Sequence, residues 1–160
     1  MIVGLGGTAG HLYQFYPEDD PGYVGRLALT QNFSAVTGAC LLLRRAVFDE
    51  VGGLVAVNLK IAYHDVDLCL KIRAAGYRNV WTPYAELYHH ESASRGKLDT
   101  AEKQHVQKAE GRYMRQYWRA RLASDPYYSP WLTLRRLNPG LSETPGIDRL
   151  WQAQGRLPDE

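Results

Sequence analysis

The segment Tyr63-His64-Asp65-Val66-Asp67 holds the residues best suited to chemistry in this chain of 160 residues. It places two carboxylates in the first turn of an expected helix, where the aligned peptide dipoles favour the ionised form. Asp65 is therefore interpreted as a proton acceptor near neutral pH, that is, a general base. Residues 65 and 67 are two apart and do not share a helix face, so Asp67 is assigned to structure. The simpler alternative is that both acids only favour the start of a helix.

A second cluster, Tyr88-His89-His90-Glu91, offers imidazole and carboxylate ligands after an expected strand. Neighbouring residues on a strand point to opposite faces, so only one of His89 and His90 can face a given site. One imidazole does not make a metal site, and further ligands would have to come from elsewhere in the fold or from another segment. The cluster is a candidate cation site on that condition.

Two other motif matches are rejected because of their context. Gly4-x-Gly6-x-x-Ala9 fits the dinucleotide-binding fingerprint, but it lacks the preceding strand and the following helix that this motif requires. Asp65-Val66-Asp67 is formally an Asp-x-Asp. Its carboxylates diverge on a helix, whereas metal chelation by such a motif needs them to converge on a loop.

The elements before this segment are read from apolar runs and glycines. The first ten residues leave almost no room for a strand and are expected to form a loop. A buried strand is expected at 34–45, because this run is short, apolar and rich in strand-forming residues. The next segment, 44–53, is expected to contain a short helix that Gly52 and Gly53 stop.

The elements around and after the acidic pair are expected to return the chain to a sheet. A mostly buried helix should run from His64 or Asp65 to Ala75, with Gly76 as its C-terminal cap. Strands are expected at 78–82 and 85–90, on either side of Pro83.

A long helix is expected from about Asp99 to Leu122. Asp99 and Glu102 form a plausible capping pair at its start. An apolar stripe along this helix is formed by Val106, Ala109, Tyr113, Tyr117 and Ala120.

Charge is unevenly distributed along the chain, although the formal net charge is only +2. Between Lys103 and Arg136, eight Lys or Arg residues stand against two acids, Glu110 and Asp125. Such a stretch suits polyphosphate, an acidic glycan or an anionic membrane surface. The alternative is a solvated helix face. No recognised motif supports binding to nucleic acid.

Composition favours one modest globular domain, because 45% of the residues are apolar and 22% are charged. No apolar run approaches the length of a membrane span, and the first residues lack the layout of a secretory signal, so a cytoplasmic location is expected. Cys40 and Cys69 lie in apolar segments without paired metal spacing, and both are expected to be buried and reduced.

Three motifs, in this order, resemble the C-terminal half of bacterial family 2 glycosyltransferases. They are VTGACLLLRRAVFDEVGG, HDVDLCLKIRAAGYRNVWTPYAELYHHESASRG and DPYYSPWLTL. The resemblance extends over about residues 1–134 and is nearest to rhamnosyltransferase-like enzymes and to enzymes that make O-antigen or cell-surface polysaccharide.

The resemblance implies an α/β fold, namely the C-terminal part of a GT-A fold with a mixed sheet and flanking helices. Residues 1–125 would form the acceptor and catalytic half, and residues 126–160 a partly irregular extension. The nucleotide-binding half of such enzymes has no counterpart in these residues, so it would belong to a missing segment or a companion chain.

The resemblance also assigns roles to individual residues. It implies that Asp65 is the general base, as the second member of an acidic pair whose first position holds His64 here. Thr37, Gly38 and Ala39 resemble the segment at the donor-sugar and acceptor pocket. Together with His64, Asp67 and Arg95 they make up the expected substrate-binding residues.

The resemblance also implies that two groups stabilise the charge that develops on the leaving diphosphate. A divalent cation, Mn²⁺ or Mg²⁺, would be held in part by His89 or His90, with other ligands from the nucleotide-binding half. Arg95 resembles a residue of the mobile loop that closes over the diphosphate.

The implied function is transfer of a sugar, with inversion, from a nucleotide-sugar donor to a glycan or lipid-linked acceptor in bacterial surface polysaccharide synthesis. The chain alone is expected to be inactive. Peripheral contact of the protein with the inner face of the cell membrane is also expected. The alternative is a non-catalytic remnant or glycan-binding module that uses aromatic residues such as Tyr13, Trp81 and Tyr84.

Overall fold

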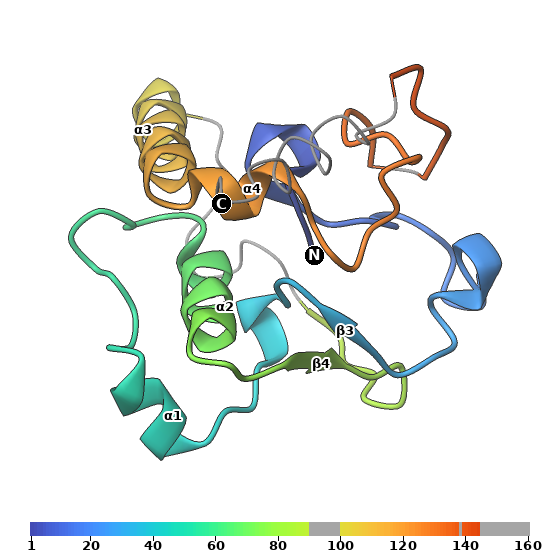
Figure 1. The fold of residues 1–160 in the computed structure, drawn as a ribbon, viewed down its shortest axis with the longest axis horizontal. Helices are drawn as coiled ribbons and strands as arrows, with labels where there is room; N and C mark the ends of the chain where they lie inside the picture. The colour runs from blue at the N-terminus through green and yellow to red at the C-terminus, as the bar shows by residue number, and fades with distance from the viewer. Residues whose placement is uncertain (90–99, 138, 145–160) are drawn as a thin grey trace, which may run out of the picture.

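The computed structural model describes residues 1–89, 100–137 and 139–144. This part of the chain is mixed α/β (Figure 1). β1 (Ile2–Val3) pairs antiparallel with β2 (Ala9–Gly10), and β3 (Gln31–Phe33) pairs antiparallel with β4 (Asn79–Trp81). The α-helices are α1 (Arg45–Glu50), α2 (His64–Ala74), α3 (Ala101–Tyr117) and α4 (Arg119–Ala123). Short 3-10 turns lie at Leu5–Gly7, Tyr23–Gly25 and Gly38–Cys40.

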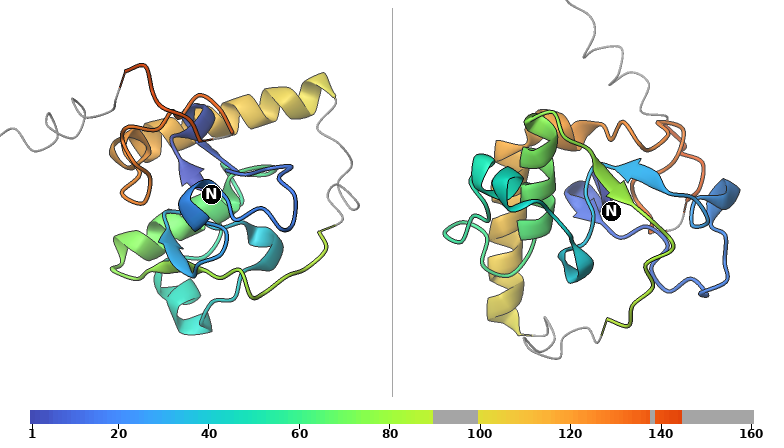
Figure 2. Two further views of the ribbon diagram at one scale, coloured as in Figure 1. Left: turned by 90° about the vertical axis from the view of Figure 1, so that its right-hand side faces the viewer. Right: turned by 90° about the horizontal axis from the view of Figure 1, so that it is seen from below.

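Helix α2 lies at the centre of the molecule. Figure 1 shows it between the β3–β4 pair and the α3–α4 segment, and Figure 2 shows the same order from two other directions. Its side chains are buried from Val66 to Leu70 and again at Ile72. A helix that is buried on nearly all sides belongs to the interior of a domain. The first turn of α2, which contains Asp65, is therefore placed by the packing of the core.

Both ends of α2 are set by residues with positive φ. Tyr63, immediately before the helix, has a φ of 63°, and Gly76, just beyond its end, has a φ of 90°. The expected helix and its glycine cap are thus confirmed. The left-handed conformation is unstrained for glycine but costs a residue such as tyrosine about 1–2 kcal/mol. Neighbouring contacts must hold Tyr63 in place.

Buried polar side chains join the strands to α2. The side-chain amide of Asn79 in β4 donates to the carbonyl oxygens of Ser34, at 2.9 Å, and Cys69, at 3.0 Å. Asp125 is 5% exposed and accepts hydrogen bonds from the Val3 amide at 2.9 Å and the Ser34 hydroxyl at 2.7 Å. The first strand, the end of β3 and the segment after α4 therefore meet at one carboxylate.

The expected strand at 34–45 is wrong, because β3 ends at Phe33 and the chain then turns at Gly38–Cys40. The backbone beyond β3 binds side chains instead of a neighbouring strand. The Ser34 carbonyl is taken by Asn79, and the Val36 amide donates to the Cys69 sulfur at 3.5 Å. The short helix that follows, α1, is confirmed, with Gly52 and Gly53 both at positive φ.

Two further expectations about strands fail and one holds. β1 and β2 occupy part of the first ten residues, which were expected to be loop, because a turn with three positive-φ glycines returns the chain. The strand at 78–82 is confirmed as β4. Residues 85–89 form no strand and are exposed, and residue 90 lies outside the described residues.

The long helix is confirmed as α3, but its end, its N-cap and its buried face differ from the expectation. It ends at Tyr117, and α4 follows after Trp118. Its N-cap is Thr100, whose hydroxyl accepts from the Lys103 amide at 3.3 Å, while Asp99 lies outside the described residues. The buried residues of α3 are Glu110, Gly111 and Met114, whereas Ala109, Tyr117 and Ala120 of the expected stripe are exposed.

No helix in the described ranges is both long and apolar enough to cross a bilayer.

The two cysteines differ in exposure, which corrects the expectation that both are buried. Cys40 is exposed and Cys69 is buried. Burial raises the pKa of the Cys69 thiol to about 11. The thiolate is the reactive form of cysteine, so the Cys69 thiol is unreactive at neutral pH for two reasons, its protonation and its burial.

We expect a thiol reagent such as Ellman's reagent to label one cysteine rapidly in the folded chain at neutral pH and both in denaturant. In Cys40→Ser, labelling should require unfolding, whereas Cys69→Ser should keep the rapid phase. Rapid labelling of folded Cys40→Ser would contradict the described position of α2.

Candidate functional site

Asp65 lies beside the segment Thr37–Ala39. The Gly38 amide donates to Asp65 Oδ2 at 2.9 Å, and Asp65 Oδ1 accepts from the Val66 amide at 2.9 Å. The Thr37 hydroxyl accepts from the Ala39 amide at 3.3 Å and so shapes the turn that presents Gly38. Two segments 27 residues apart in sequence are thus in direct contact.

The contact between Gly38 and Asp65 leaves little room for a side chain at position 38. A Cβ atom at position 38 would lie 3.3 Å from the Asp65 Cβ and 3.7 Å from Asp65 Oδ2. Asp65 and His64 are half-buried, while Gly38 and Ala39 are exposed. The carboxylate is therefore oriented by two backbone amides and still lies at the protein surface.

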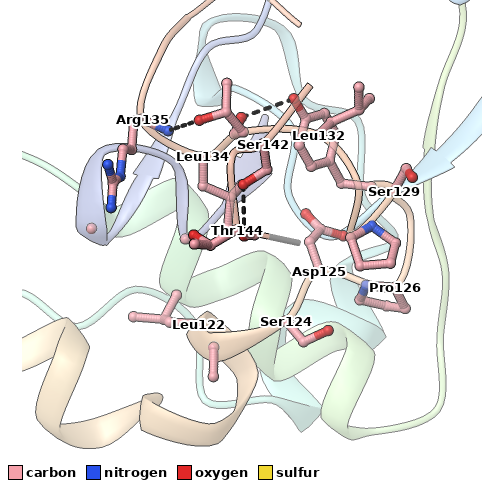
Figure 3. Close-up of a pocket in the computed structure, with 16 residues that line it drawn as sticks. Leu122, Ser124, Asp125, Pro126, Ser129, Leu132, Leu134, Arg135, Ser142 and Thr144 are labelled. Carbon is pink, nitrogen blue, oxygen red and sulfur yellow. Dashed lines mark hydrogen bonds between the residues drawn. The ribbon is translucent and has the colours of Figure 1, made fainter. Parts of the chain in front are cut away.

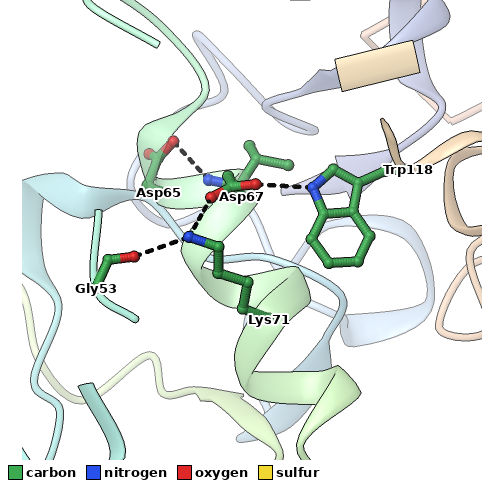
Figure 4. A network of polar contacts seen from close by, with 6 residues as sticks. Gly53, Asp65, Asp67, Lys71 and Trp118 are labelled. Carbon is green, nitrogen blue, oxygen red and sulfur yellow. Dashed lines mark hydrogen bonds and ion pairs between the residues drawn. The ribbon is translucent and has the colours of Figure 1, made fainter. Parts of the chain in front are cut away.

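Asp67 occupies a different environment (Figure 4). It is fully buried, with an exposed fraction of 0%. Its Oδ2 forms an ion pair with Lys71 Nζ at 2.8 Å, and its Oδ1 accepts from the Trp118 indole at 2.8 Å. Lys71 Nζ also donates to the Gly53 carbonyl at 2.9 Å. Asp67 therefore links α2 to the end of α3 and to the turn after α1, and a substrate cannot reach its carboxylate from solvent in this structure.

The residue that sequence reasoning missed is Glu110. It is 3% exposed, and its carboxylate accepts hydrogen bonds from the amides of Lys60, Ile61 and Ala62 at 2.6, 2.9 and 2.7 Å. A buried carboxylate is stabilised when backbone N–H groups replace its hydration. These bonds hold the three residues that lead into Tyr63 and Asp65.

Gly111, next to Glu110, faces Tyr63. A Cβ atom at position 111 would lie 3.3 Å from an Arg115 guanidinium nitrogen, 3.6 Å from the Thr8 hydroxyl and 3.8 Å from the Tyr63 ring, and the last two are ordinary van der Waals contacts. Glu110 lies four residues after Val106 and four before Met114, so helical spacing already places it on the inner face. The expected apolar stripe follows Val106 with Ala109 and Tyr113, whereas the buried positions are Glu110 and Met114. An acid in such a helix is usually exposed, so the pattern does not single out Glu110.

The histidines are less informative. His64 is half-buried and His89 is exposed. His90 and Arg95 lie outside the described residues. Among the described residues, no group of three His, Cys, Asp or Glu side chains could hold a metal ion. These residues alone do not fit a cation site, so the divalent cation stays a prediction that needs ligands from elsewhere.

An open pocket of about 660 Å³ lies apart from this candidate site (Figure 3). Its lining comes from the turn after β1 and from the chain between Leu122 and Thr144, and includes Asp125 and Arg135. Neither Asp65 nor any of the expected substrate-binding residues lines it. This pocket is therefore not evidence for an acceptor-binding groove next to Asp65.

Comparison with known proteins gives relatives by sequence. The chain is 55% identical over 136 residues to uncharacterized protein y4gI of Sinorhizobium fredii, a match that covers 85% of this chain and 15% of the relative. It is 35% identical over 154 residues to the O-antigen biosynthesis protein RfbC of Myxococcus xanthus, covering 91% of this chain and 11% of the relative.

A third relative is the N-acetylglucosaminyl-diphospho-decaprenol L-rhamnosyltransferase of Mycobacterium tuberculosis. It is 39% identical over 62 residues, which is 39% of this chain and 20% of the relative. The chain thus spans a fifth or less of these proteins. No family model and no solved structure matches it. The sequence relationship is to proteins named for O-antigen synthesis and for rhamnosyl transfer.

We expect Glu110→Gln to lower the free energy of unfolding by about 2–3 kcal/mol, because an amide NH₂ replaces an oxygen that faces backbone donors. Glu102→Gln, an exposed acid in the same helix, should cost less than about 1 kcal/mol. Urea denaturation monitored by circular dichroism measures both. Equal stability of the two variants would show that the clamp at residues 60–62 contributes nothing.

Asp67→Asn should destabilise the fold by about 3 kcal/mol, because it leaves the Lys71 ammonium, 16% exposed, without its partner. Lys71→Met in that background should recover part of the loss. The pair Arg45–Asp49 has the same four-residue spacing but is exposed, so Asp49→Asn should cost less than about 1 kcal/mol. A double-mutant cycle by urea denaturation tests the difference.

Proposed function

We propose that the chain is the acceptor-side, catalytic-base part of an inverting family 2 glycosyltransferase of the GT-A type. The observation that carries the proposal is the contact between Asp65 and the Gly38 amide. It joins the acid that opens α2 to the segment expected at the sugar pocket. The names of two relatives, an O-antigen biosynthesis protein and a rhamnosyltransferase, support sugar transfer in surface polysaccharide synthesis as the class of reaction.

The chemical role of Asp65 is proton transfer. An acceptor hydroxyl is a weak nucleophile, so Asp65 removes its proton while the oxygen attacks the anomeric carbon of the donor sugar. The bond from that carbon to the nucleoside diphosphate breaks on the opposite face, which inverts the configuration. The Gly38 and Val66 amides fix the carboxylate. Each carboxylate oxygen has two lone pairs, so it can also accept the hydroxyl of an acceptor.

Other parts of the reaction need groups beyond the described residues. We expect Arg95 to contact the leaving diphosphate, and His89 or His90 to contribute to a divalent cation with ligands from a nucleotide-binding segment. That segment would stand in the same or a companion chain, and it would bind the nucleotide-sugar donor. The proton transfer to Asp65 does not depend on where these groups come from.

The alternative of a glycan-binding module is not favoured by its aromatic residues. Tyr13 is 8% exposed, so its ring cannot stack on a sugar, while Tyr84 is 84% exposed. Trp81 is half-buried and packs edge-on against Phe33 at 6.2 Å between ring centroids. These three residues do not form one exposed aromatic platform.

The test of the proposed base is Asp65→Asn in a polypeptide or complex that joins this chain to a nucleotide-binding segment. We expect kcat to fall by about 10²–10⁴-fold while the Kd for the donor is unchanged, because only the proton acceptor is lost. Asp49→Asn, which removes an exposed acid of α1, is the matched control and should keep full activity. Wild-type turnover by Asp65→Asn would remove Asp65 from this role.

A further inference from the structure

The basic stretch between Lys103 and Arg136 has no exposed acid in this structure. Its two acids, Glu110 and Asp125, are 3% and 5% exposed, and both carboxylates accept backbone hydrogen bonds inside the protein. Exposed basic side chains in the same stretch are Lys108, Arg112, Arg115, Arg119, Arg121, Arg135 and Arg136. The surface of this stretch is therefore more positively charged than its sequence indicates, because its two acids are buried.

In α3, exposed cations lie on the outer side of the helix. Lys108 and Arg112 are four residues apart, so they share a face of α3 that points away from Glu110 and Met114. Arg115 lies at the edge of this face, and its guanidinium donates to the Thr8 hydroxyl at 2.9 Å. Tyr117, nine residues after Lys108, lies on the opposite side of α3 and stacks on Tyr113 with 5.7 Å between ring centroids. The outer surface of α3 that carries Lys108 and Arg112, with Arg115 at its edge, is here called the basic face.

The basic face is tied to the candidate site through the same helices. Glu110 holds the backbone of residues 60–62 before Asp65, and Trp118 donates to Asp67. The inner side of the α3–α4 segment therefore positions the first turn of α2 while its outer side presents cations. A partner bound to the basic face would therefore lie at a fixed distance and orientation from Asp65.

We propose that the basic face docks on an anionic phospholipid surface. A row of exposed cations along a helix fits an extended anionic plane, because each ammonium or guanidinium can meet a separate headgroup. The lining of the 660 Å³ pocket includes Arg135 but none of the α3 cations, so those cations do not converge on that cavity. This inference adds a docking surface to the proposed function and does not rest on it.

The test is co-sedimentation of the whole chain with vesicles of phosphatidylglycerol mixed with phosphatidylcholine, compared with pure phosphatidylcholine. We expect binding only to the anionic vesicles, and weaker binding as salt is raised. Each basic residue near such a surface contributes to binding, so Lys108→Gln/Arg112→Gln should lower the partition coefficient by about 30-fold, roughly fivefold for each charge.

The matched control is Arg44→Gln/Arg78→Gln, which removes the same charge from exposed positions outside the basic face and should bind nearly as the wild type does. Equal losses in both double variants would overturn the proposal, as would equal binding to the two kinds of vesicle. Tighter binding to soluble polyphosphate than to vesicles, lost in Lys108→Gln/Arg112→Gln, would assign the face to a soluble polyanion instead. Asp65→Asn should bind vesicles normally, so the outcome is separate from that of the transfer assay.

Discussion

The carboxylate of Glu110, held by three backbone amides, is the contact on which the rest of the candidate site depends. It satisfies a buried negative charge without a cation and fixes the segment that enters α2. That segment leads into Tyr63, a tyrosine in the left-handed conformation, and the clamp stabilises it against its intrinsic cost. Asp65 follows two residues later, so Glu110 in a different helix helps to place it, while the Gly38 and Val66 amides orient its carboxylate.

Acids in this chain divide into two groups by their partners. Glu110 and Asp125 are buried against backbone amides, and Asp67 is buried against Lys71 and an indole. Asp65 alone among these four is half-buried and remains at the surface. Burial of a charge without compensation is costly, so each buried acid is tied to specific donors and serves to join segments. Asp65 is the member of the set whose side chain solvent still reaches.

Prediction from sequence succeeded where local signals were strong. The glycines after α1 and α2 mark the ends of those helices, and the dense apolar run identified α2 as buried. It failed where side chains far apart in sequence compete for backbone groups, as at Ser34, whose carbonyl binds Asn79 and not a strand. The contact between Asp65 and Gly38 could not be derived from their spacing in the sequence. Glu110 was missed because a helix pattern does not reveal which acid finds donors in a loop 50 residues earlier.

The burial of α2 on nearly all sides has a consequence for how this chain can vary. One helix supplies both the interior of the protein and the acid at its surface, so most substitutions in it will lower the yield of folded protein before they alter any reactivity. A mutational screen scored only by lost activity would therefore collect unstable variants. Measuring the abundance of each variant alongside its activity would be needed to recognise the few positions that act on chemistry.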